Sequence, residues 1–323
     1  MQTRTLIGIG LAALSGIGFG AGGIAAQYLF TYCRFTPLDL VSIRLFGAGL
    51  ILLLAYGIAT RRNFFRDIFR NLRNIGAILV FGIGLLLLQL TFFVSIDKSN
   101  AGTASLMVGF VPLMILFWLA VREKRPVTGT EYVCLALAVT GVVLLVTRGD
   151  FTSLNFTVAG VVWGLISAGF QAFCTLQPKK VTGRIGVVPV LGCGLLVGGL
   201  LGFIVQPPFH MDVDWTPAAF ANYLFIVLVA SVLAYYSLLK SMEYVSASVT
   251  GLLSSFEPLT AVVLTVIVFH VPFNAWEITG AACVILNMVL LALQDRKKER
   301  KVIGKQGKTC SDAVKFCCNF TAF

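Results

Sequence analysis

Long runs of apolar residues follow one another along this chain and are separated by short polar joints. A membrane-spanning helix needs about 20 consecutive, mainly apolar residues, and the runs reach that length repeatedly. Helices are expected because lipid cannot satisfy the backbone groups of loops or sheet edges. The pattern predicts an all-α integral membrane protein of ten transmembrane helices, near residues 6–30, 38–59, 75–95, 100–121, 130–147, 158–177, 186–205, 218–238, 247–269 and 275–293.

Composition and charge placement agree with a membrane protein and add an orientation. Only 12% of the residues are charged, against about 25% in an ordinary soluble domain. The net charge of +11 would suggest a nucleic-acid partner for a soluble protein, but here the basic residues lie mainly in the joints on one side of the membrane. If the N-terminus is cytoplasmic, all of the 25 Lys and Arg residues except Arg34, Arg44, Lys98 and Arg148 fall on the inner side. We expect a plasma (inner) membrane protein with both termini in the cytoplasm, in contact with lipid and not with nucleic acid.

The two parts of the chain resemble each other. Shifting the sequence by 146 residues aligns Ser95–Leu145 with Ser241–Leu291 without a gap, and Pro112 then meets Pro258. The sequence therefore divides into a first five-helix repeat at 1–147, a second at 158–293 and a basic cytoplasmic tail at 294–323. Because five is odd, the second repeat must enter the membrane in the opposite orientation. Such inverted repeats typically form carriers with a midplane site.

The motifs around these aligned segments resemble a known family. The segment from Tyr235 to Ser248 and the stretch Ser254-Ser-Phe-Glu-Pro-Leu259 resemble the second repeat of EamA-type permeases of the drug/metabolite transporter superfamily. Arg44 is similar to an arginine often found in the second span of that family, whereas Phe269-His270 departs from its usual Gly-Glu. The resemblance implies a permease, commonly an exporter, of amino acids, nucleotide precursors or other metabolites, with no soluble cofactor.

Glu257 is the most informative single residue. An ionised carboxylate near the middle of a span costs about 2.5 to 3.5 kcal/mol on insertion scales, so such residues usually have a role. Thr250 and Ser254 share its helical face, and Pro258 favours a kink beside it, as Pro112 does in the first repeat. We expect this face to line a cavity in which Glu257 binds a substrate amine or a proton; the alternative is a structural hydrogen bond at the kink.

Other polar and aromatic side chains are candidates for the same cavity. Trp163, Ser167 and Gln171 follow one another at four-residue steps, and either line the cavity or pack between helices. Further candidates are Gln89, Phe93 and Tyr235, although aromatic residues in spans more often anchor at interfaces. For Arg44, snorkelling to the lipid headgroups is favoured over pairing with a carboxylate in the cavity.

Glycines recur at four-residue spacing in two spans. Gly16, Gly20 and Gly23 form one stripe with Gln27, and Gly194, Gly198 and Gly202 form another. Small residues at this spacing let membrane helices approach closely, so we expect both stripes to be packing surfaces.

Three classes of function remain open at the level of sequence. A secondary carrier of a small molecule, driven without ATP and with or without protons, accounts for the inverted halves; no Walker motif is present. A membrane enzyme would lack the residues for metal or general-base chemistry. The only histidines, His210 and His270, are placed near the outer surface, and no metal site is expected. A receptor or scaffold is a third alternative. An aromatic and polar cavity with at most one or two charges suits small zwitterions or weakly charged metabolites better than polyanions.

Overall fold

The computed structural model describes residues 2–60, 71–111, 113–115, 118, 129–147, 157–207, 212–241, 244–245, 253, 256–270, 274–287, 289–290 and 293. All regular elements in these residues are helical. They are α1 (Gln2–Tyr32), α2 (Pro37–Thr60), α4 (Leu72–Lys98), α5 (Ala101–Val108), α7 (Gly129–Thr147), α8 (Thr157–Leu176), α9 (Lys179–Ile185), α10 (Val187–Val205), α11 (Pro217–Leu224), η2 (Phe225–Leu233), α12 (Ala234–Ser241) and α14 (Phe256–Phe269), followed by an apolar helix at Ala275–Asn287.

Six of the described helices are long and apolar enough to cross a membrane, and four shorter apolar helices accompany them. This number fits the ten spans expected from the apolar runs. The structure adds a short basic helix, α9, in the joint before α10, where Gly186 takes a φ of +106° that favours glycine. The tail at 294–323 and Pro112 lie outside the described residues.

Helix ends in the joints are fixed by side-chain caps. The Asp39 carboxylate accepts from the Thr36 backbone N–H (3.1 Å), and the Thr36 hydroxyl accepts from the Asp39 N–H (3.2 Å). This reciprocal pair satisfies two backbone donors that a helix start leaves free. Asn274 and Glu277 form the same arrangement before the helix at Ala275–Asn287.

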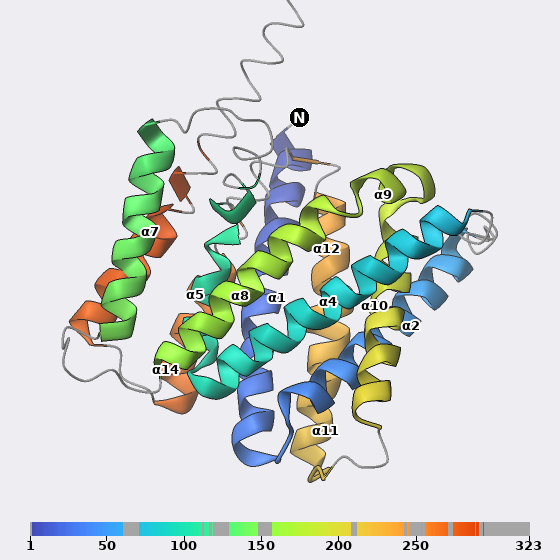
Figure 1. The fold of residues 1–323 in the computed structure, drawn as a ribbon, viewed down its shortest axis with the longest axis horizontal. Helices are drawn as coiled ribbons and strands as arrows, with labels where there is room; N and C mark the ends of the chain where they lie inside the picture. Colours follow the sequence, from blue (N-terminus) through green and yellow to red (C-terminus); the bar gives the residue numbers. More distant parts are fainter. Residues whose placement is uncertain are drawn as a thin grey trace, which may run out of the picture.

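The helices pack as a bundle in which segments far apart in the sequence lie side by side (Figure 1). α1 packs against η2, α12 and α14, whereas α8 packs against α4 and α5. α2 and α10 run along each other, and α10 also contacts α4. At one edge of the bundle, Gly141 of α7 faces Gly280, Cys283 and Val284 of the helix at Ala275–Asn287.

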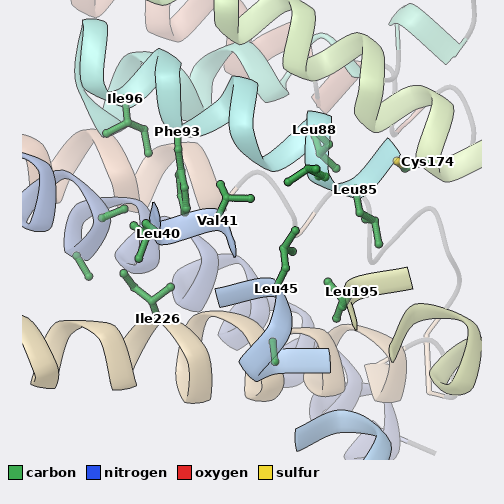
Figure 2. Close-up of a cluster of buried hydrophobic side chains, with 14 of the residues drawn as sticks. Leu40, Val41, Leu45, Leu85, Leu88, Phe93, Ile96, Cys174, Leu195 and Ile226 are labelled. Carbon is green, nitrogen blue, oxygen red and sulfur yellow. The ribbon is translucent and has the colours of Figure 1, made fainter. Parts of the chain in front are cut away.

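Both glycine stripes are packing surfaces, as expected. A methyl group added at Gly16 would lie 3.0 Å from the Phe256 Cβ in α14, and one added at Gly198 would lie 3.0 Å from the Gly82 carbonyl oxygen in α4. Gly202 faces the Ser42 side chain in α2. The core between these helices is apolar, and Figure 2 shows Leu40, Leu45 and Phe93 among its buried side chains.

The helix between Pro217 and Ser241 is not uniform. Its middle part, η2, is π-helical, although nothing in its apolar sequence Phe-Ile-Val-Leu-Val-Ala-Ser-Val-Leu breaks the expected span. π-Helical segments are rare and frequently lie at functional sites. This one lies beside α1 and α2.

Candidate functional site

A central cavity of about 270 Å³ lies between helices from both parts of the chain. Arg44 of α2 and Gln89 of α4 contribute polar groups from the first part, and Gln171 of α8, Tyr235 of α12 and Glu257 of α14 contribute them from the second. The remaining lining is mainly apolar and consists of Phe19, Gly22, Gly23, Phe81, Leu85, Leu88, Phe92, Phe93, Val108, Cys174, Thr175, Leu191 and Leu238.

Arg44 is the best-anchored polar residue of this cavity. It is only 7% exposed, and its guanidinium donates to Ser231 Oγ from Nε (2.9 Å) and to Gln89 Oε1 from Nη1 (3.1 Å). A longer contact joins Nη2 to the Ala230 carbonyl (3.4 Å). The expectation that Arg44 snorkels to the headgroups is therefore wrong. Acceptors on two other helices hold the side chain inside the bundle.

The π-helical segment supplies two of the acceptors for Arg44. Ser231 donates its own hydroxyl proton to the Ile226 carbonyl, five residues earlier (2.8 Å), so its oxygen lone pairs remain free to accept from Arg44. The Ala230 carbonyl is the neighbouring acceptor in η2. This geometry links η2 to the cation.

The Arg44 guanidinium also lies over an aromatic ring. Its central carbon is 5.2 Å from the centre of the Phe93 ring, which is within the range of a cation–π interaction. Phe93 contacts Phe30 edge-on, with 5.7 Å between the ring centres. The aromatic packing fixes the ring under the charge.

Glu257 lies in α14, whose described residues begin at Phe256. It receives no hydrogen bond from the residues that the structure describes, and it forms no ion pair with Arg44. The backbone of Glu257 packs directly on α1, because a Cβ at Gly20 would lie 2.5 Å from its carbonyl oxygen. Backbone packing therefore holds the carboxylate at the cavity.

Tyr235 and Phe19 form an aromatic wall. Their ring centres are 4.9 Å apart in an edge-to-face arrangement, and both residues line the cavity. Phe19 was not among the candidates because it lies between the glycines of the first span. The sequence offered no sign that this side chain turns away from the packing stripe.

The face of α8 that was expected to act as a unit is divided. Gln171 lines the cavity, whereas Trp163 is 39% exposed and does not. Ser167 is buried between helices, where its hydroxyl donates to the Leu88 carbonyl of α4 (3.2 Å). For Trp163 and Ser167, the cavity-lining hypothesis is not supported. Ser167 instead packs between helices, which was the alternative interpretation.

The roles of two other candidates and of the hinge at Pro258 stay predictions. Thr250 and Ser254 lie outside the described residues. Pro258 is buried in α14. A kink before it stays a prediction.

Contacts between the two parts of the chain close one end of the bundle. The Asp214 N–H donates to the Cys33 carbonyl (3.2 Å), and the Gln206 amide donates to the Asp39 carboxylate (2.5 Å). Phe35 and Trp215 stack edge-on, with ring centres 5.3 Å apart. Thr175 of α8 and Leu238 of α12 also line the cavity. Both lie near the end of their helix that points away from these contacts. The cavity is thus displaced from the closed end.

Comparison with known proteins adds relatives and a fold. The protein is 28% identical to the uncharacterized inner membrane transporter YicL of Salmonella typhimurium, over 89% of this chain and 95% of that protein. It is 27% identical to the uncharacterized transporter YwfM of Bacillus subtilis, over 82% and 87%. One solved crystal structure has the same fold, with a TM-score of 0.60 and 16% identity, over 93% of this chain and 99% of the other.

A family model describes nearly all of the spans. The model of the EamA-like transporter family matches residues 6–147 and 158–293. Together with the transporter relatives, this match excludes the alternative of a membrane enzyme. The chain therefore belongs to the EamA-like transporter family and is a multi-pass membrane transporter.

Proposed function

We propose that the protein is a secondary carrier that exports a small organic metabolite, such as an amino acid, by alternating access between two inverted five-helix repeats. The observation that carries this proposal is the central cavity, which combines one cation, one anion, amides and aromatic rings from both parts of the chain. A carrier site of this family of mechanisms is expected at the interface of its repeats.

The helix packing supports the inverted repeat. A two-fold axis relating the repeats would make α1 equivalent to α8, the α11–η2–α12 helix to α4, and α14 to α5. α1 packs on η2, α12 and α14, and α8 packs on α4 and α5, as such an axis requires. The contacts between α2 and α10, and between α5 and α14, would then lie on the axis.

The closed end of the bundle supports alternating access. One end carries backbone, side-chain and aromatic contacts between the two parts, while the cavity lies away from it. With both termini in the cytoplasm, as the charge distribution predicts, the closed end is the outer one. The two parts are then in contact on the outer side, as an exporter requires while it takes up its substrate from the cytoplasm.

Counterflow in proteoliposomes tests the carrier. Purified protein should exchange at least one labelled compound from a panel of amino acids and other metabolites, and inside-out vesicles should take it up. Glu257→Gln should lower the rate or change its pH dependence, because the cavity loses its carboxylate. Asp97→Asn is the matched control, since Asp97 pairs with Lys98 (2.9 Å) at the end of α4.

Two outcomes would contradict the proposal in different ways. Absence of flux for a broad panel would argue for a non-transporting receptor or scaffold. A Glu257→Gln protein with an unchanged rate and pH dependence would remove Glu257 from the mechanism and leave the carrier intact.

A further inference from the structure

The cavity contains two opposite charges that are not paired with each other. Arg44 is buried, and Glu257 lines the same space, yet no ion pair joins them. Taking an ion out of water costs several kcal/mol unless it is paired and hydrogen-bonded. The site as it stands leaves part of that cost uncompensated on both charges, and a bound molecule could supply the missing partners.

Arg44 has hydrogen-bonding capacity to spare. A guanidinium carries five N–H donors, and three are used, on Ser231, Gln89 and Ala230. Each terminal nitrogen therefore keeps one N–H without a partner among the described residues. All three acceptors are neutral, so the positive charge is oriented but not neutralised. Two adjacent N–H groups on a guanidinium match the two oxygens of a carboxylate.

The surroundings of Arg44 restrict what can reach it. Ser231 holds Nε from η2 and Phe93 lies beneath the guanidinium plane, so the side chain cannot easily turn away. Gln89 is bound through its amide oxygen, a neutral acceptor that the oxygen of a carboxylate can outcompete. The cavity volume of about 270 Å³ admits only a small molecule.

We propose that Arg44 is the receptor for a carboxylate group on the transported molecule, and that Gln89 holds its place when the cavity is empty. The substrate class is then a small organic carboxylate, whose cationic group, where it has one, faces Glu257. This inference rests on the proposed carrier function and adds the chemical group that the carrier requires.

Substrate analogues that differ only in the carboxylate test this assignment. In proteoliposomes preloaded with the compound that gives the strongest counterflow, matched acids, their carboxamides and the amines without the carboxyl group compete as unlabelled inhibitors. The acids should inhibit about 10- to 100-fold more strongly than the carboxamides, because a hydrogen bond to a charged group is lost. Equal inhibition by acid and carboxamide would overturn the inference and leave the carrier proposal standing, whereas absence of any counterflow would contradict the carrier proposal itself.

Gln89→Glu separates a recognition role of Arg44 from a structural one. The substitution keeps the size of the side chain but places a permanent carboxylate on the Arg44 guanidinium. If Arg44 only fastens α2 to η2, the variant should fold and keep the wild-type selectivity. If Arg44 receives the substrate carboxylate, the variant should lose its preference for acids over carboxamides while the thermal stability stays the same or rises. Arg44→Lys, which keeps the charge but not the paired donors, should show an intermediate preference.

Discussion

The contact between α1 and α14 leads to a quantitative prediction for Gly20→Ala. A methyl group at position 20 would lie 2.5 Å from the Glu257 carbonyl oxygen, 2.9 Å from the Thr260 Cβ and 3.1 Å from the Ala261 nitrogen. Ordinary contact begins at 3.4 Å, so the helices must separate by about 1 Å. Two of the three atoms belong to helix backbone and cannot rotate away.

The size of the effect follows from two opposing contributions. Forcing one extra carbon into a well-packed core costs about 1 to 3 kcal/mol. Replacing glycine by alanine in a helix interior returns up to about 1 kcal/mol. The free energy of unfolding should therefore fall by up to about 2 kcal/mol, and about 1 to 3 kcal/mol should separate this variant from one that gains the same helix propensity without a clash. The substitution should also impair transport, because α14 carries Glu257.

Gly10→Ala is the matched control for this prediction. Gly10 belongs to the same helix, but a methyl group there meets nothing within 4 Å, so only the gain in helix propensity remains. Both variants can be unfolded in detergent micelles with increasing denaturant, followed by circular dichroism. If Gly20→Ala is as stable as Gly10→Ala, the close approach of α1 and α14 is not as described.

Three further predictions concern the joints. Burial raises the pKa of the Cys33 thiol. In a variant that keeps only this cysteine, the alkylation rate should therefore still rise with pH where the rate of an exposed cysteine is already constant. Rates that level off at the same pH would contradict the raised pKa. Asp39→Ala should lower the free energy of unfolding by about 2 to 4 kcal/mol and speed up alkylation of Cys33, because it removes the hydrogen bonds from Thr36 and Gln206 to the carboxylate. An unchanged alkylation rate would show that Asp39 does not hold this end of the bundle together. Gly186→Ala should destabilise the protein by about 1 to 2 kcal/mol because of its positive φ, and equal denaturation midpoints for this variant and the α9 control Gly183→Ala would count against that strain.

The helices could be predicted from the sequence because the bilayer imposes their length. α2 begins at Pro37, next to the expected 38, and α10 ends at Val205 as expected. The π-helical segment could not be predicted from the sequence. Its residues are apolar apart from Ser231, and none of them marks the wider helix, which packs against α1 and α2.

The site could be predicted only in part, because periodicity identifies a helix face but not the helix that packs against it. Residues four apart on a helix are rotated by about 40° from one another, so Trp163, Ser167 and Gln171 turn through about 80° in total. That rotation takes α8 from the bundle surface, through its contact with α4, to the cavity. Arg44 shows the same limit, because the acceptors that hold it lie on α4 and η2.

The proposed two-fold axis also predicts which contacts a transport cycle breaks. In alternating access the two repeats exchange conformations, so a contact between equivalent helices, such as α2 and α10, maps onto itself and should persist. The contact between Phe35 and Trp215 joins two joints that the axis carries to the opposite end. It should therefore be absent in the other state.

Two aromatic pairs of similar separation allow a matched test. Phe35 and Trp215 have ring centres 5.3 Å apart at the closed end, and Phe46 and Phe203 have ring centres 5.5 Å apart between α2 and α10. With each pair replaced by cysteines in a background without other cysteines, a short bifunctional thiol reagent should stop counterflow across 35 and 215, and a reductant should restore it. The same cross-link across 46 and 203 should leave most of the flux. If the two cross-links act alike, the exchange of conformations between the repeats is refuted, because a contact between equivalent helices should persist in both states and the contact at the closed end should not.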